Sequence, residues 1–87
     1  MDSRVAVIGI IVEDKESVGA LNDILHEYAF CIIGRMGIPY PKRGVSVISV
    51  AVDAPQDVIS ALSGKIGRLK GVNAKTAFSN LITEERC

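Results

Sequence analysis

The sequence predicts an α+β sandwich in which a four-stranded antiparallel sheet carries two helices on one face. Three observations support this fold class. Residues 4–12 form an apolar, mostly β-branched run with no polar side chain between Arg4 and Glu13. Two later segments repeat apolar residues at helical spacing. The resulting order, strand-helix-strand-strand-helix-strand, is that of the ferredoxin-like fold.

The first strand is predicted at residues 5–12. Successive side chains of a strand point to opposite faces, so Val5, Val7 and Ile11 share one face and the intervening residues share the other. Both faces are apolar. A strand of this kind belongs in the middle of a sheet that is covered on both sides.

The first helix is predicted at residues 17–28. Asp14 or Ser17 can cap its N-terminus, and the acidic residues nearby suit the positive end of the helix dipole. An apolar stripe follows at helical spacing, formed by Val18, Leu21, Ile24, Leu25 and Tyr28.

The second strand is predicted at residues 31–38, where two glycines indicate a bulge or a close backbone approach. Pro39 and Pro41 are expected to end it. The third strand is predicted at residues 45–52 and is apolar on both faces apart from Ser46 and Ser49.

The second helix is predicted to begin near Asp53, which with Gln56 resembles a capping box, while Pro55 suits the first turn. Gly67 is the expected C-cap. A fourth strand follows at residues 72–78 and alternates apolar with polar residues, as an edge strand does. The folded domain is therefore expected at residues 1–80, with a flexible tail at residues 81–87.

Right-handed crossovers place the first and third strands at the centre of the sheet and the other two at its edges. Two helices cover only one face, yet both faces of the central strands are apolar. The uncovered face is expected to be an interaction surface. A second copy of the chain, giving a homodimer or a tetramer, is its simplest cover.

The composition fits one small globular domain: 87 residues, 48% of them hydrophobic, with a net charge of zero. No apolar run reaches the roughly 20 residues of a membrane span, and no secretory signal is present, so we expect a cytoplasmic protein. The zero net charge and scarce aromatics speak against nucleic-acid binding. Acidic residues dominate the first third of the chain and basic residues follow later, which indicates either solvated surface or complementary subunit faces.

Catalysis is not expected, because no Ser/His/Asp or Cys/His set occurs at a recognisable spacing. His26 is the only histidine and has no second ligand near it in sequence, so neither a metal site nor a cofactor is predicted. Cys31 is expected to be a buried free thiol, and it has no CxxC relation to Cys87.

The turn into the first helix is the leading candidate for an effector site. Its candidate residues are Asp14, Glu16, Ser17, Val18 and Gly19. A helix N-terminus offers unpaired N–H groups, and Gly19 permits close approach. The alternative is that Gly19 only allows tight helix packing. The acidic side chains favour an amino group or a subunit contact over a bare anion.

A second candidate is the segment around the two prolines, with Arg35, Tyr40, Lys42 and Arg43. A stiffened loop carrying cations and an aromatic suits contact with a ligand or a partner. The alternative is a hairpin that only protects a sheet edge, since proline and lysine blunt strand edges.

Two segments resemble known regulatory proteins. Residues 16–21, in which Gly19 and Leu21 match, are similar to the Asp-x-Pro-Gly-x-Leu turn of ACT domains, with Glu16 and Val18 departing from it. The segment Gly-Arg-Met-Gly-Ile-Pro-Tyr at residues 34–40, followed by a basic turn, resembles the iron-only hydrogenase system regulators, which are small stand-alone ACT-like proteins. The resemblance implies a ligand-sensing role and an oligomer, and it implies no reaction.

The sequence therefore predicts a non-enzymatic regulator that works as a homo-oligomer and senses a small-molecule effector at a subunit interface. Two alternatives stay open. One is a structural module that docks on a larger protein without a small ligand, and the other is a small metal sensor.

Overall fold

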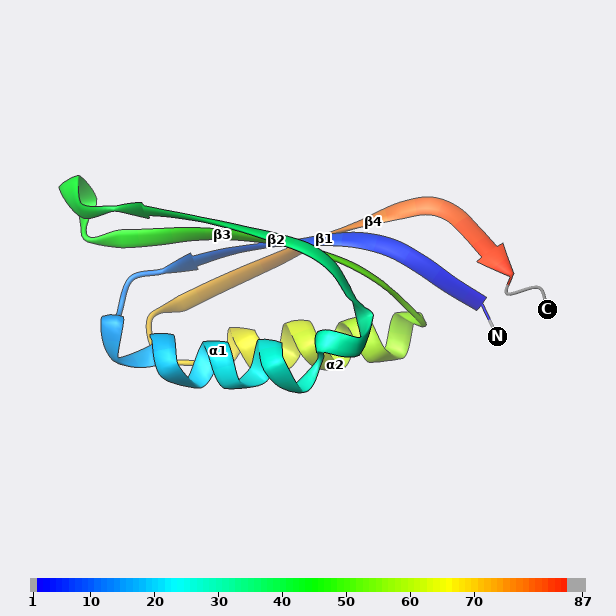
Figure 1. Ribbon diagram of the computed structural model, residues 1–87, viewed down its shortest axis with the longest axis horizontal. Helices are drawn as coiled ribbons and strands as arrows, with labels where there is room; N and C mark the ends of the chain where they lie inside the picture. The colour runs from blue at the N-terminus through cyan, green and yellow to red at the C-terminus, as the bar shows by residue number, and fades with distance from the viewer. Residues whose placement is uncertain (1, 85–87) are drawn as a thin grey trace.

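The computed structural model describes residues 2–84 as one antiparallel sheet in the order β2-β3-β1-β4, accompanied by two α-helices (Figure 1). The elements are β1 Asp2–Val12, α1 Val18–Glu27, β2 Ile32–Tyr40, β3 Val45–Ala54, α2 Gln56–Gly67 and β4 Val72–Glu84. The predicted strand order is confirmed, because the two most apolar strands, β1 and β3, lie side by side at the centre.

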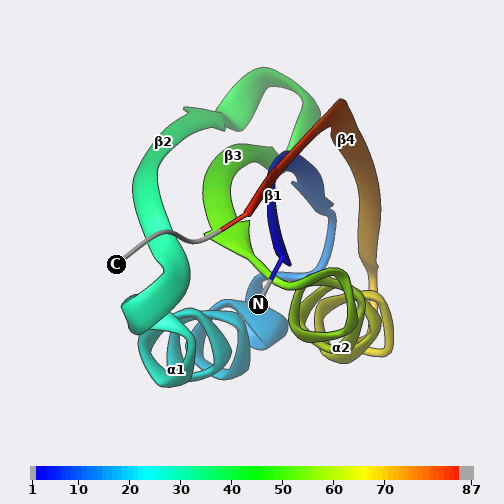
Figure 2. The same ribbon diagram turned by 90° about the vertical axis from the view of Figure 1, so that its right-hand side faces the viewer.

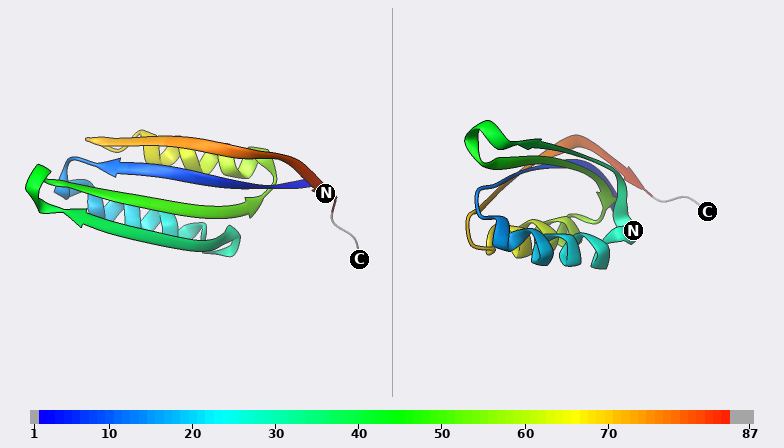
Figure 3. Two further views of the ribbon diagram at one scale, coloured as in Figure 1. Left: turned by 90° about the horizontal axis from the view of Figure 1, so that it is seen from above. Right: turned by 60° about the vertical axis from the view of Figure 1, so that its left-hand side comes forward.

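Both helices lie on the same face of the sheet, as the sequence predicts. Viewed end-on, α1 lies below the β2–β3 half and α2 below the β1–β4 half (Figure 2). Seen from above, the strands run nearly parallel to the helices and the β2–β3 hairpin reaches past one end of the helix layer (Figure 3). Neither helix within residues 2–84 is long and apolar enough to cross a membrane.

The core lies between the sheet and the helices. Ile8 pairs with Val50 across the two central strands, and both side chains are fully buried. The other large side chains that are almost completely buried come from both layers: Ile10, Leu21, Leu25, Val52, Ile59, Leu62 and Ile66. Burying one such side chain stabilises a fold by roughly 1.5–3 kcal/mol, so this layer holds the helices against the sheet.

The opposite face of the sheet carries many apolar side chains, and no helix within residues 2–84 covers it. We call it the outer sheet face, and its large apolar side chains are Val5, Val7, Ile11, Met36, Ile38 and Val47. Each is between 41% and 61% exposed. The register places Val47 opposite Ile11 and Ile38 opposite Val47, so these three side chains lie next to one another. The predicted uncovered apolar face is therefore present.

The start of α2 differs from the predicted capping box. Asp53 belongs to β3 and pairs with Val5 of β1, and the N-cap of α2 is Pro55, without a side-chain cap. Gln56 instead accepts a hydrogen bond of 2.8 Å from Arg4 Nη1. The prediction was wrong because pairing with β1 holds Asp53 in the sheet.

The predicted C-cap at Gly67 is also wrong. Gly67 is the last helical residue, and the cap position is Arg68 in an ordinary right-handed conformation. The glycine that this turn requires is Gly71, whose φ is 67°. A Cβ atom there would lie 2.6 Å from the Cβ of Asp14, so the β1–α1 turn sits directly against this backbone.

Both edge strands are longer than predicted. β2 continues through Pro39 to Tyr40, which an edge strand tolerates because proline can face away from the ladder. The predicted bulge is present between Ile32 and Gly34. β4 continues past residue 78 because residues 82–84 pair with residues 2–4. Residues 85–87 of the predicted tail lie outside the described residues.

Candidate functional site

The turn after β1 is held together by its own first residue. Asp14 Oδ1 accepts a hydrogen bond of 2.9 Å from the Glu16 N–H and so caps a short 3-10 helix, Lys15–Ser17. Ser17 then stands at the N-cap of α1 but makes no capping hydrogen bond. The sequence allows either Asp14 or Ser17 as a cap. Only the Asp14 side chain makes a capping hydrogen bond, and it does so at the 3-10 helix rather than at α1.

The same turn is fixed to the connection between α2 and β4. Ser17 is 7% exposed, and its Oγ donates a hydrogen bond of 2.6 Å to the carbonyl of Lys70. The Glu13 N–H donates to the Gly71 carbonyl at 2.7 Å. Ser17 therefore positions the turn and offers no free group to an effector.

Val18 and Gly19 face solvent at the start of α1. Val18 is 37% exposed, and no atom lies within 4 Å of the position that a Cβ on Gly19 would take. No packing among residues 2–84 requires a glycine there. Close approach from outside, by a ligand or another subunit, stays the prediction for this position.

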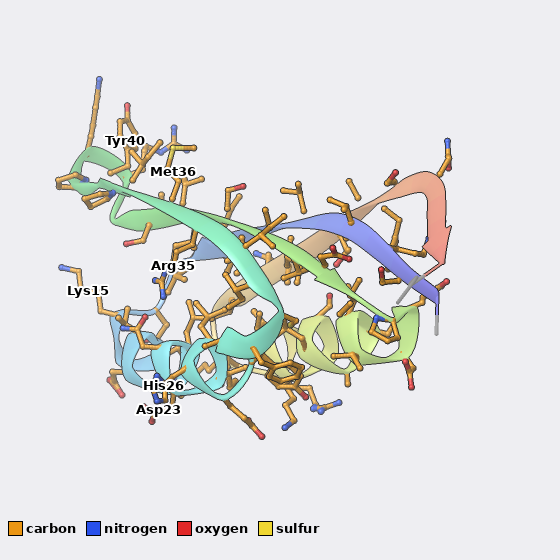
Figure 4. All side chains as sticks on the ribbon, turned by 45° about the vertical axis from the view of Figure 1, so that its right-hand side comes forward. Lys15, Asp23, His26, Arg35, Met36 and Tyr40 are labelled. Carbon is orange, nitrogen blue, oxygen red and sulfur yellow. The ribbon has the colours of Figure 1, made fainter. Side chains whose placement is uncertain are left out.

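The structure divides the second candidate segment. Lys42 and Arg43 lie in the short 3-10 turn Pro41–Arg43 at the tip of the β2–β3 hairpin. Tyr40 points away from the helices, whereas Arg35 lies between β2 and α1 (Figure 4). The four residues therefore belong to two different surfaces.

A cavity of about 260 Å³ lies between the β1–α1 turn and this hairpin. We call it the turn–hairpin cavity, and it is lined by Val12, Lys15, Val18, Pro39, Tyr40, Pro41, Gly44, Val45 and Ser46. Lys15 is the only charged residue among them. The cavity joins the two segments that the sequence presents as separate candidates, because pairing of Val12 with Ser46 places the turn beside the hairpin. Its walls suit a small, largely apolar ligand.

A second cleft, between α1 and β2, was not predicted from the sequence. Asn22 and His26 line it from α1 and Arg35 lines it from β2. Asn22 and His26 are four residues apart and so share a helix face. That spacing was visible in the sequence, but the position of Arg35 opposite them depends on the strand register.

The candidate sites within residues 2–84 are suited to binding a ligand rather than to chemical reaction. Within residues 2–84, His, Cys, Asp and Glu side chains form no group of three that could hold a metal ion. Cys31 is buried, and its Sγ donates a hydrogen bond of 3.2 Å to the Tyr28 carbonyl. Burial raises the pKa of this thiol, against a smaller opposite effect of a backbone hydrogen bond. A thiol of this kind is a structural group rather than an activated nucleophile.

Comparison with known proteins identifies relatives of the chain. The family model described as "TM1266-like: Iron-only hydrogenase system regulator, putative" matches residues 4–76. The uncharacterized protein TM1266 from Thermotoga maritima is similar in structure, with a TM-score of 0.84 and 30% sequence identity over 87% of this chain and 96% of that one.

A more distant likeness is to a formyltetrahydrofolate deformylase from Pseudomonas putida KT2440. Its TM-score is 0.60 at 12% identity, and the match covers 84% of this chain and 28% of the deformylase. At that identity the likeness shows the ferredoxin-like fold alone. A search of the curated proteins found no match to the sequence.

Proposed function

The chain belongs to the TM1266-like family of iron-only hydrogenase system regulators, and from this premise we propose that it is a non-enzymatic regulator acting as a homo-oligomer. In this proposal a small-molecule effector binds where two subunits meet. The family description supports a regulatory role. We place the protein in the cytoplasm, where a buried free thiol such as Cys31 stays reduced.

The observation that carries the proposal is the turn–hairpin cavity. It combines the turn that resembles the effector-binding turn of ACT domains with the hairpin of the neighbouring strands. Val18 lines it, and the exposed Gly19 follows directly along α1. The hairpin projects past the helix layer at this end of the molecule (Figure 1), so a subunit that packs around the end of the hairpin would reach the cavity on the helical side of the sheet.

The outer sheet face supports the oligomer. A four-stranded sheet with about ten residues per strand measures roughly 19 by 33 Å, or about 600 Å² in plan. That is comparable with the roughly 800 Å² that each partner contributes to a standard interface. The six large apolar side chains of this face stay 41–61% exposed in the single chain. Covering them removes apolar surface from water, which drives association.

The two features together provide a route to regulation. A ligand that contacts two subunits binds the assembled state better than the separate chains. Such a ligand stabilises the assembly by that difference in affinity. The effector would thereby control either the amount of oligomer or its shape.

The test begins with thermal-shift screening of the wild-type protein against amino acids and other metabolites. Each compound that raises the melting temperature is then titrated against Gly19→Val. We expect this variant to fold, because nothing lies within 4 Å of the new Cβ, and to bind the compound more weakly. Ala61→Val adds the same branch to an exposed position on α2 and serves as the matched control.

Two outcomes separate the proposal from its alternative. If Gly19→Val binds the compound as tightly as the wild type does, the effector does not bind at this turn. If the protein assembles but no compound shifts its melting temperature, the structural interaction module becomes the better account, with the outer sheet face as its docking surface.

A further inference from the structure

The cleft between α1 and β2 is separate from the turn–hairpin cavity and shares no lining residue with it. It has a volume of about 410 Å³ and is lined by Asn22, Leu25, His26, Ala29, Ile32 and Arg35. Figure 4 shows Arg35 reaching from β2 toward α1, the helix that carries His26. We call it the α1–β2 cleft.

The strand register explains why Arg35 enters this cleft. Arg35 pairs with Val50, which is fully buried beneath the helices, so both residues point to the helical face of the sheet. β2 is an edge strand, and the next helix-facing position along it, Gly37, carries no side chain. The long side chain of Arg35 therefore crosses to α1, where Arg35 Nη2 donates a long hydrogen bond of 3.4 Å to Asn22 Oδ1.

The charge of Arg35 has no carboxylate partner within the part of the chain that the structure describes. The ion pairs there join Lys65 to Glu27 and Lys70 to Asp14. Asp23 follows Asn22 in sequence but does not line the cleft. A guanidinium has five N–H donors in a planar fork, so one long bond to an amide leaves most of them available. His26 adds a second nitrogen-bearing group on the same helix face as Asn22.

The floor of the α1–β2 cleft is apolar. Leu25 is 2% exposed and lies beneath the floor, while Ala29 and Ile32 supply its accessible apolar surface. A ligand that fits must therefore carry both an anionic head and an apolar body. A carboxylate matches the guanidinium fork with two parallel hydrogen bonds, while a branched hydrocarbon covers the floor.

We propose that the α1–β2 cleft binds small organic carboxylates, with Arg35 holding the carboxylate, Asn22 and His26 flanking it, and Ala29 and Ile32 contacting the hydrocarbon part. The site is complete within one subunit. Binding at this cleft can therefore be tested independently of the proposed effector site and of assembly.

The experiment is a titration followed by ¹⁵N–¹H NMR on the full chain. The probe is 3-methylbutanoate, and its neutral amide, 3-methylbutanamide, tests the need for the charge. Inorganic phosphate tests whether any anion suffices. We expect saturable shifts of the Asn22, His26 and Arg35 amide signals with the carboxylate, none with the amide, and weaker binding of phosphate because it cannot cover the apolar floor.

Variants then assign the binding to Arg35. Arg35→Gln should bind 3-methylbutanoate at least about tenfold more weakly, since a hydrogen-bonded charge is lost. Arg35→Lys keeps the charge but loses the planar fork of N–H donors, so its affinity for 3-methylbutanoate should lie between those of the wild type and Arg35→Gln. Arg68→Gln removes an exposed cation at the end of α2 and is the matched control, with affinity unchanged.

Several results would overturn the site. They are the absence of saturable shifts in the wild type, equal affinity for phosphate and 3-methylbutanoate, or an affinity that Arg35→Gln leaves intact. If Arg35→Gln loses its dispersed spectrum, Arg35→Lys decides the matter, and an affinity equal to that of the wild type would then refute the proposal.

Discussion

Single residues decide the geometry of the turn that carries the candidate site. Gly71 adopts φ 67° and its α-carbon lies so close to Asp14 that a side chain would collide with that residue. Gly44, in the β2–β3 hairpin, has the same φ but open space around it. The sequence shows both glycines without showing which of them is sterically required, because only the fold brings Asp14 against Gly71.

Replacing these two glycines separates backbone strain from collision. Gly44→Ala should lower the free energy of unfolding by about 1–2 kcal/mol, the cost of a left-handed conformation for a residue with a Cβ. Gly71→Ala should cost clearly more, because Asp14 must also move. Urea unfolding at 25 °C measures both values. Equal losses would show that a Cβ on Gly71 does not collide with Asp14, contrary to the separation of 2.6 Å.

The hydrogen bond from Ser17 to the Lys70 carbonyl makes a similar test of the turn. Ser17→Ala leaves a carbonyl without its buried partner, which should lower the free energy of unfolding by about 1–3 kcal/mol. Ser60→Ala, at an exposed position of α2, should change it by less than about 0.5 kcal/mol. Urea unfolding of the two variants makes the comparison, and similar losses in both would contradict the positioning role of Ser17.

Cys31 provides a test that depends on pH. Burial raises the pKa of its thiol, so the thiolate that reacts with a disulfide reagent forms at a higher pH than in an unfolded chain. In the Cys87→Ser variant, Cys31 should react slowly at pH 8 and at the rate of free cysteine once the chain is unfolded in urea. Fast reaction of the folded protein would contradict its burial.

The same shift has a consequence for stability. The pKa of the Cys31 thiol is higher in the folded chain than in the unfolded chain. The protonated thiol therefore makes its full contribution to the free energy of unfolding at pH values below the pKa of the unfolded thiol. This contribution is lost as the pH rises from there toward the folded value.

At the scale of elements, the pattern of apolar residues predicted the strand order correctly. β1 and β3 are apolar on both faces and lie at the centre, while β2 tolerates its glycines and prolines as an edge strand. The boundaries of α1 were predicted to within one residue, whereas the caps of α2 were predicted less well. The local signal from Asp53 to Gln56 matches a capping box, but pairing between Asp53 and Val5 extends β3 through that point.

The outer sheet face gives the prediction for this scale. Ile11 lies on this face at the end of the central strand β1, opposite Val47, and is 44% exposed. Ile11→Lys should leave the fold intact and shift the protein toward monomer, because an interface that buries an unpaired charge is strongly disfavoured. Ser60→Lys places the same charge on the outside of α2 and should leave assembly unchanged. Sedimentation velocity compares the two variants, and assembly of Ile11→Lys at the wild-type level would exclude this face.

At the scale of the whole molecule, the candidate site is a product of the topology. The sequence names the turn at residues 14–19 and the segment around Tyr40 as two possibilities. Strand register then places Lys15 and Val18 against Pro39 and Pro41 around one cavity. It also separates Arg35 from Lys42 and Arg43 and turns it toward α1. These arrangements depend on contacts between residues more than ten positions apart, which local patterns do not specify.

The proposed regulation requires that identical subunits assemble. Sedimentation equilibrium of the wild-type protein from one to one hundred micromolar tests it most directly, because an interface of ordinary affinity is filled within that range. We expect a mass of two or four times 9.3 kDa at tens of micromolar. A mass of 9.3 kDa throughout the range would contradict it.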